Sequence, residues 1–129
     1  MARNKSAPLT DAELRLMEVL WIRESATVAD VVENLPQPPS AYSTVLTILR
    51  ILETKGFISH AEEGRAHRYT AQVGREAARR NALQALSDKF FNGSSALLLT
   101  HLVSDHKLSP KDVRRIRALL DRRRPKDES

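Results

Sequence analysis

Short hydroxyl side chains and one arginine gather on one face of the helix that the sequence predicts between residues 41 and 55. At about 100° per residue, the residues of that polar face are Ser43, Thr44, Thr47, Arg50 and Thr54. The residues of the opposite, apolar face are Ala41, Val45, Ile48, Leu49 and Leu52. Hydroxyl and guanidinium groups form hydrogen bonds, and short side chains allow another polar surface to come close. The face favours contact with a hydrogen-bonding partner, although a core helix with a small polar outer face explains it equally well by itself.

Both ends of this helix are marked in the sequence. Ser40 follows Pro38-Pro39 and is the expected N-cap, because a serine hydroxyl can accept hydrogen bonds from the first backbone N–H groups of a helix. Gly56 follows Lys55 and is the expected stop, because glycine readily adopts the left-handed conformation that ends helices.

A β-hairpin is expected directly after the helix, over residues 57–70. Two short runs, 57–61 and 66–70, flank a turn in which Gly64 supplies a positive φ. Tyr69 is expected to pack inward, and the hairpin also carries the basic and hydrogen-bonding residues His60, Arg65, His67 and Arg68. An exposed hairpin kept soluble by its two glutamates explains these charges too. Helix and hairpin together favour DNA contact, because they offer both base-reading and backbone-binding groups.

Two earlier helices must position this pair of elements. Thr10 and Glu13 predict a capping box at the start of the first helix, in which Trp21 is the expected core anchor. Thr27 and Asp30 predict the start of a second, shorter helix that ends before Pro36. Three short helices followed by a hairpin predict a winged helix-turn-helix. We therefore expect a DNA-binding domain at residues 9–71, after a mobile basic tail at 1–8.

Residues 72–124 are predicted as a separate region of three helices, followed by a polar tail at 125–129. Asn92-Gly93 breaks the first helix, the second is apolar nearly all round, and Ser109-Pro110 starts the third. Helices this short cannot cover an all-apolar helix within one chain, so we expect a homodimer. The expected interface residues are Phe90, Phe91, Leu97, Leu98, Leu99, Leu102, Val103, Ile116, Leu119 and Leu120. The fold class is mainly α with a small β-hairpin.

Composition limits the remaining choices. The chain has no cysteine, which excludes disulfides and thiolate metal sites. Its net charge of +5 suits a phosphate-bearing partner, but the basic excess lies in residues 72–129, so bulk charge is weak support for DNA binding. No apolar run is long enough for a signal peptide or a membrane span, so we expect a soluble, cytoplasmic protein without direct membrane insertion.

No pattern of catalytic residues is present. The sequence lacks a glycine-rich phosphate loop, a nucleophile elbow and metal-ligand spacing, so we expect no enzyme activity, cofactor or metal site. A winged helix used as a protein-interaction module is the main alternative. The hydroxyl-rich face argues against it, because protein interfaces favour aromatic and large apolar anchors. A small-molecule-responsive winged-helix repressor of another family is also open.

The segments TDAELRLMEVLW, TVADVVENL, AYSTVLTILRILETKGFI, EEGRAHRYTA, FFNGSS and LSPKDVRRIRALL together resemble the penicillinase-repressor family, the BlaI/MecI/CopY type. The resemblance covers essentially the whole chain and implies a homodimeric transcriptional repressor on a twofold DNA operator. It implies base reading by Thr44, Thr47 and Arg50, beside which lies Ser43, and a wing at residues 62–69. The expected contacts of the DNA backbone are Tyr42, Lys55, His60, Arg65, His67 and Arg68. Copper-responsive members carry a C-terminal cysteine cluster, so the resemblance does not extend to copper sensing.

The family also implies a route of induction. In its antibiotic-responsive members, a membrane sensor protease system triggers cleavage of an Asn-Phe bond, and gap-free alignment places that bond at His101-Leu102 here. Histidine is larger than asparagine and leucine lacks the ring of phenylalanine, so a protease pocket shaped for the family's pair need not accept this one. Release by cleavage at His101-Leu102 stays open and is the less favoured mechanism.

Overall fold

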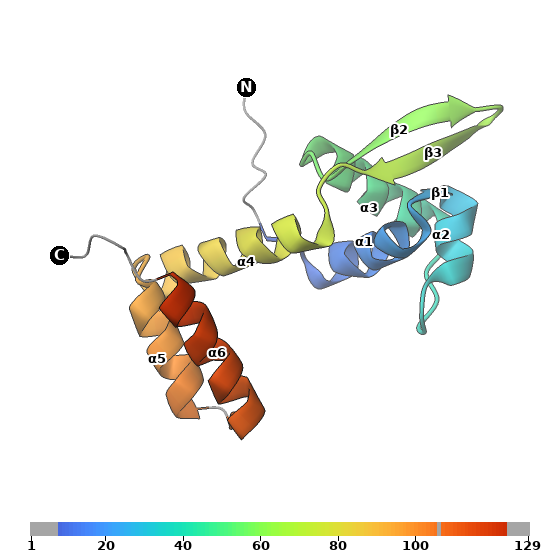
Figure 1. The fold of residues 1–129 in the computed structure, drawn as a ribbon. Coiled ribbons are helices and arrows are strands. Elements are labelled where there is room, and N and C mark those ends of the chain that lie inside the picture. The colour runs from blue at the N-terminus through green and yellow to red at the C-terminus, as the bar shows by residue number, and fades with distance from the viewer. Residues whose placement is uncertain (1–7, 106, 124–129) are drawn as a thin grey trace.

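The computed structural model describes residues 8–105 and 107–123, so the predicted tails lie almost entirely outside the described residues. Its elements are α1 (Asp11–Arg23), β1 (Ser25–Thr27), α2 (Val28–Asn34), α3 (Tyr42–Thr54), β2 (Ile58–Glu63), β3 (Ala66–Ala71), α4 (Arg75–Phe90), α5 (Ser95–Asp105) and α6 (Pro110–Arg122). Figure 1 shows α1 to α3 and the strands gathered at one end, with α4 leading away to α5 and α6. The prediction of a mainly helical chain with an N-terminal winged helix is confirmed.

The first two helices begin at the predicted capping boxes. The Thr10 hydroxyl accepts a hydrogen bond from the Glu13 N–H at 3.1 Å, and the Glu13 carboxylate accepts one from the Thr10 N–H at 2.9 Å. Thr27 and Asp30 exchange the same two bonds at the start of α2. The Thr27 N–H bond is the main reason why the pKa of Asp30 lies below its usual value. These local hydrogen bonds fix where each helix starts.

The predicted hairpin is present as β2 and β3, and a third strand extends it to an antiparallel sheet ordered β1-β3-β2. The added strand is β1, where Ala26 pairs with Tyr69 of β3, and the sequence analysis placed no strand there. Three residues are too few to show an alternating pattern, so only the pairing with β3 defines this strand. In the hairpin, Gly64 has a φ of 64° in the turn between β2 and β3, as predicted.

The hydrophobic core lies inside the winged domain, between the sheet and the first three helices. Its most buried large side chains are Leu16, Met17, Leu20, Val31, Val45, Leu49, Leu52, Phe57 and Tyr69. The inward packing predicted for Tyr69 is therefore confirmed. This core holds the inner face of α3 and leaves its outer face free.

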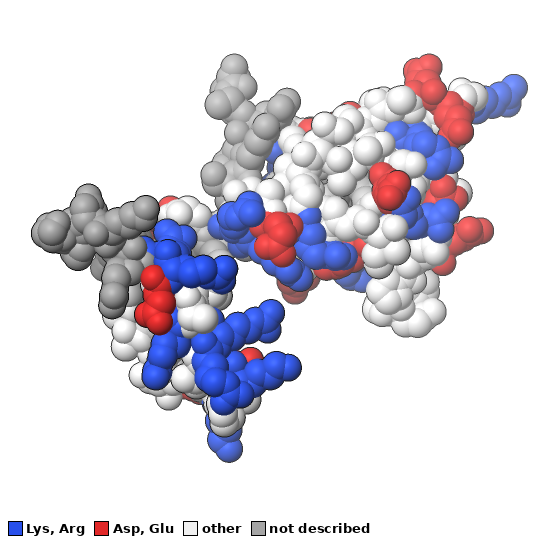
Figure 2. All heavy atoms as spheres, viewed as in Figure 1, with Lys and Arg blue, Asp and Glu red and all other residues white. Residues whose placement is uncertain are grey.

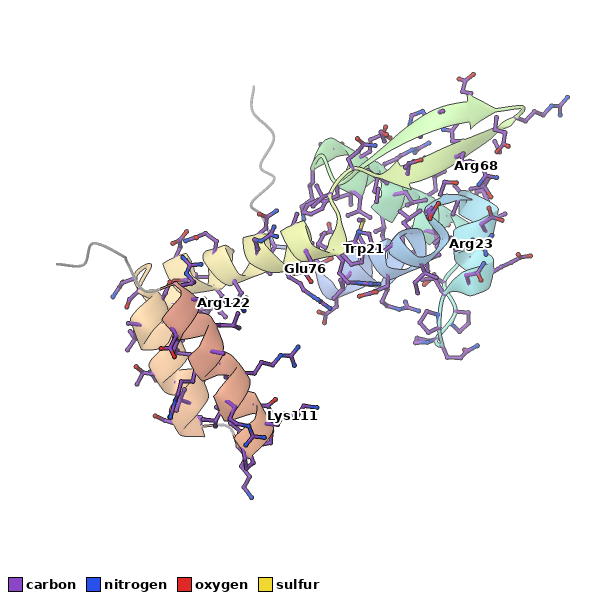
Figure 3. The ribbon with its side chains drawn as sticks, in the orientation of Figure 1. Trp21, Arg23, Arg68, Glu76, Lys111 and Arg122 are labelled. Carbon is purple, nitrogen blue, oxygen red and sulfur yellow. The ribbon has the colours of Figure 1, made fainter. Side chains whose placement is uncertain are left out.

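Trp21, predicted as a core anchor, packs against this core and is partly buried. Its indole N–H donates a hydrogen bond to the Val73 carbonyl at 2.9 Å. The Arg75 guanidinium lies 5.2 Å from the centre of the indole ring and 2.6 Å from the Glu18 carboxylate. Figure 3 shows Trp21 close to the start of α4. Trp21 therefore joins the winged domain to the helix that leaves it.

The three C-terminal helices bury little of their apolar surface. Asn92 and Gly93 both have positive φ between α4 and α5, and the Ser109 hydroxyl caps α6 by accepting from the Asp112 N–H at 3.0 Å, as predicted. No described residue of α5 or α6 is buried, although α5 is rich in leucine. Within the described ranges, no helix is long and apolar enough to cross a membrane.

Candidate nucleic-acid interface

The outer face of α3 is polar and exposed. Val45, Leu49 and Leu52 point into the core, whereas every residue of the predicted polar face, Ser43, Thr44, Thr47, Arg50 and Thr54, is exposed. The helix begins one residue later than predicted, since Ala41 and not Ser40 is the N-cap, and no side chain caps it. Its first N–H groups are thus left for water or for a ligand, as is common at helix starts that bind anions.

Hydrogen bonds within α3 determine which hydrogen bonds its hydroxyl groups can still form with a ligand. Thr47 donates its proton to the Ser43 carbonyl, and Thr54 donates to the Arg50 carbonyl, each at 3.0 Å. Both threonines therefore present acceptor lone pairs and a methyl group outward rather than a donor. The Arg50 guanidinium has no hydrogen bond or ion pair with the described residues, so its planar set of donors is available to a ligand.

Ile51 also lies on the outer face of α3, where the sequence analysis named no apolar residue. Its side chain is 45% exposed and shares a surface hollow with Thr47, Arg50, Thr54 and Lys55. At about 100° per residue it falls between Thr44 and Thr47, so its angular position could have revealed it. An exposed isoleucine at this place can make apolar contact with a thymine methyl group in a major groove.

Lys55, predicted to contact the DNA backbone, has a partner within the protein. Its ammonium group lies 2.7 Å from the Glu13 carboxylate, which is 5% exposed, and 3.3 Å from the Pro8 carbonyl. Burial alone would raise the pKa of Glu13, but Lys55 and the Thr10 N–H together hold that pKa below its usual value. The pair ties the end of α3 to the capping box that starts α1, so we assign Lys55 to positioning the helix.

The sheet brings two histidines together beside α3. His60 on β2 stacks on His67 on β3, with ring centroids 4.3 Å apart, and His60 also bonds to the Glu53 carboxylate at 2.8 Å. Both rings line a hollow of about 280 Å³ between α3 and the wing, together with Tyr42 and Arg50. The Tyr42 side chain is 57% exposed at the start of α3. His60 therefore holds the wing against α3, while His67 and Tyr42 face the space beside it.

The two wing arginines differ in their surroundings. Arg68 lies 2.6 Å from the Glu63 carboxylate, 3.2 Å from the Ser25 hydroxyl and 3.9 Å from the Asp30 carboxylate. The hydrogen bond with Glu63 raises the pKa of Arg68. Figure 3 shows Arg68 on β3 near α2. Arg65, in the turn of the hairpin, is exposed and has no such partner among the described residues, so it is the free cation of the wing.

Together these elements present a helix that fits a major groove and a hairpin with a basic turn beside it. Such a pair defines a winged-helix DNA-binding protein, because the helix can read base edges while the hairpin holds the phosphate backbone. In the described part of the chain, no group of three or more potential metal ligands occurs.

Comparisons with known proteins extend this assignment to the whole chain. A family model described as Penicillinase repressor matches residues 9–122, so the chain belongs to the penicillinase-repressor family and is a DNA-binding transcriptional repressor. The transcriptional regulator BlaI of Mycobacterium tuberculosis (strain CDC 1551 / Oshkosh) is 36% identical over 102 residues, which cover 77% of this chain and 74% of that protein. The Penicillinase repressor of Bacillus licheniformis is 25% identical over 118 residues, 91% of this chain and 92% of that protein.

A solved structure supports the fold of the N-terminal half. The solution structure of the DNA-binding domain of the repressor BlaI aligns with a TM-score of 0.51 and 29% sequence identity. The alignment covers 60% of this chain and 93% of that domain.

Proposed function

We propose that the chain acts as a homodimer that represses transcription from a twofold operator in the cytoplasm. In this proposal, residues 9–71 bind DNA, and residues 72–124 hold two copies together. The proposal rests on the outer face of α3, where short hydroxyl groups surround Arg50. Neither Arg50 nor Arg65, which lies in the turn of the neighbouring wing, has an ion-pair partner among the described residues.

Each side chain of the interface has a proposed role. Arg50 donates two hydrogen bonds to a guanine edge, and Thr47 accepts from a base or contacts a thymine methyl group. Ser43 and Thr44 extend the same contact along the groove. Arg65, His67 and Tyr42 approach the phosphate backbone. Lys55, His60 and Arg68 act indirectly, because their internal partners fix the helix and the wing in place.

The C-terminal helices support the homodimer through their uncovered apolar residues. The described members of this surface are Leu83, Leu86, Phe90, Leu97, Leu99, Leu102, Val103, Val113, Leu119 and Leu120, all exposed in one chain. So many exposed large apolar side chains favour contact with another protein, and a second copy satisfies them with a closed, twofold interface. Two reading helices related by such an axis can enter major grooves about 34 to 36 Å apart.

The proposed function is tested by fluorescence anisotropy with labelled duplexes tiled across the DNA upstream of the chain's own coding region. One duplex is expected to bind at least about a thousandfold more tightly than a random sequence of equal length. Binding is expected to weaken steeply between about 50 and 200 mM salt, as counterion release requires. Equal affinity for all duplexes, or affinity that does not depend on salt, would favour the protein-interaction module instead.

Release from DNA by cleavage concerns the His101-Leu102 bond within α5. His101 lies in the middle of α5, where its ring meets the edge of Phe91 at 5.4 Å and lies 3.7 Å from the Asp105 carboxylate. A protease needs an extended strand, so cleavage at His101-Leu102 requires α5 to unfold locally. With the changed dipeptide, this keeps cleavage the less favoured mechanism. Intact mass spectrometry before and after β-lactam challenge tests it, and a fragment that ends at His101 would make cleavage the mechanism.

A further inference from the structure

Lysine and arginine side chains follow one face of α6. At about 100° per residue, Lys111, Arg115 and Arg122 fall within about 40° of one another, with Arg114 at the margin. The apolar residues Val113, Ile116 and Leu120 lie on the other side of the helix. Figure 2 shows acidic and basic side chains mixed over the winged domain, whereas basic side chains dominate around α6. Figure 3 shows Lys111 and Arg122 at opposite ends of this helix. We call Lys111, Arg114, Arg115 and Arg122 the basic face.

The cations of the basic face have no ion-pair partner among residues 8–105 and 107–123. In the winged domain and at its edge, Lys55, Arg68 and Arg75 each have a carboxylate oxygen within 2.7 Å. By contrast, no carboxylate among residues 8–105 and 107–123 lies within 4.0 Å of a cation of the basic face. These four charges therefore form no ion pair in the described part of the chain.

Two of the charges, Lys111 and Arg115, do not help α6 to form, whereas Arg122 lies in the last turn, where a cation is favoured. Lys111 lies in the first turn, where the positive end of the helix disfavours a cation. Lys111 and Arg115 are four residues apart, and like charges at that spacing repel each other. Helix stabilisation therefore does not account for Lys111 and Arg115, whereas a negatively charged ligand would.

We propose that the basic face binds the phosphate backbone of duplex DNA outside the operator contacts made by α3 and the wing. From Lys111 to Arg122 the helix rises about 16 Å, the length of about five base pairs, so the row can follow several phosphates. Guanidinium groups suit phosphate oxygens, which they bind with two parallel hydrogen bonds.

A membrane surface fits the basic face less well. Helices that lie in a membrane interface combine basic residues with an apolar side that enters the lipid, often through Trp or Phe. Residues 110–122 contain no aromatic side chain, and the apolar side of α6 belongs to the surface proposed for the dimer. DNA is also the polyanion already held close by the same chain, which raises its effective concentration at the basic face. This last step rests on the proposed function.

Two sources of DNA backbone can meet the basic face: the flanks of the operator duplex, or a second duplex. The test compares the full-length wild type, Lys111→Gln/Arg115→Gln, and the control Lys89→Gln/Lys107→Gln, which removes two exposed cations outside the basic face. Affinity and its salt dependence are measured with the shortest bound operator duplex, the same operator with long flanks, and the short operator plus a second, differently labelled duplex.

The wild type is expected to bind the flanked operator more tightly than the short one, or to capture the second duplex. A dimer of the Lys111→Gln/Arg115→Gln variant loses up to four phosphate contacts, so its salt slope with the additional DNA falls by about two to four. Its affinity for the short operator, its thermal midpoint and its dimerisation should be unchanged, and the control should match the wild type.

Identical behaviour of the variant and the wild type with all three DNA substrates would overturn the proposal. So would a loss of binding to anionic lipid vesicles, rather than to DNA, in the Lys111→Gln/Arg115→Gln variant. Failure of the wild type to select any operator would instead contradict the proposed function, because the basic face plays no part in sequence selection.

Discussion

Arg50 and Arg68 carry the same charge, but the structure surrounds them differently. The Arg50 guanidinium on α3 has no hydrogen bond or ion pair with the described residues, whereas the Arg68 guanidinium contacts Glu63, Ser25 and Asp30. The sequence pattern assigned base reading to the first and backbone contact to the second. Sequence spacing alone could not show that Arg68 has internal partners, because those partners come from β1, β2 and α2.

Replacing Arg50 with Ala should cost about 1 to 3 kcal/mol in operator binding and relax the preference at one position of each half-site, because a bidentate base contact is lost. Competition binding with operators changed at single positions measures both effects. Arg65→Ala is the matched control, which should weaken all sequences alike and lower the salt slope by about one per protomer. Equal losses for operator and random DNA in Arg50→Ala would remove Arg50 from the base-reading set.

Ile51 should contribute to specificity through apolar contact. Replacing Ile51 with Ser keeps the helix but removes the apolar atoms that can meet a thymine methyl group, so operator binding should weaken by about 1 kcal/mol or more. Thymine is replaced with uracil at one operator position after another. DNA binding by the wild type should weaken at one of these positions, and binding by Ile51→Ser should not change at that position. The same response of both proteins to uracil at every position would show that Ile51 meets no methyl group.

At the scale of elements, local signals predicted the helix boundaries well. Each helix signal depends on residues within four positions of each other, so the sequence contains it in full. These signals are the capping boxes at Thr10 and Thr27, the stop at Gly56 and the cap at Ser109. Strand β1 and the displaced cap of α3 were missed. Strand β1 depends on its pairing with β3, a distant segment, which no local pattern records.

The Glu13–Lys55 pair makes a prediction about stability and pH. Replacing Lys55 with Met leaves a buried carboxylate without its cation, which should lower the free energy of unfolding by about 1 to 3 kcal/mol at pH 7. Lys55 helps to hold the pKa of Glu13 below its usual value, so the stability from this pair is present above about pH 4.3 and disappears as pH falls through the lowered pKa.

Urea denaturation of the wild type and Lys55→Met at several pH values measures this difference. The gap between the two proteins should shrink as pH falls through the lowered pKa of Glu13, because the carboxylate then becomes protonated in the wild type as well. Arg79→Met is the control, because it removes a cation from an exposed pair with Glu76 and should change stability by about 0.5 kcal/mol or less. A gap that stays constant from pH 7 to pH 3 would mean that packing of the Lys55 side chain, not its charge, stabilises the fold.

At the scale of the whole molecule, the winged domain and the C-terminal helices differ in how completely a single chain buries their apolar side chains. The winged domain encloses a core that the sequence predicted through its apolar periodicity. The C-terminal helices leave their apolar residues exposed, and in the proposed homodimer a second chain covers them, which no pattern within one sequence describes. The contacts of Trp21 with Val73 and of Arg75 with Glu18 connect the two regions.

Replacing Leu102 with Asp tests the dimer surface. The Leu102 side chain is 44% exposed in one chain, so the change should be tolerated by the monomer but should place an unpaired carboxylate in the proposed interface. The expected cost to dimerisation is about 3 to 5 kcal/mol. Sedimentation equilibrium measures it, and Ile22→Asp, which changes an exposed apolar residue of the winged domain, is the control. A wild type that is monomeric at micromolar concentration would contradict the homodimer.

A hydroxyl-radical footprint of the full-length repressor on the DNA upstream of its own coding region tests the central claim most directly. A homodimer that places α3 in two major grooves should protect two patches related by a twofold axis, with centres about 10 to 10.5 base pairs or a multiple of that distance apart. Arg50→Ala should lose both patches together at a concentration where the wild type protects them. A single asymmetric patch, or uniform weak protection along the fragment, would contradict sequence-specific binding by a symmetric dimer.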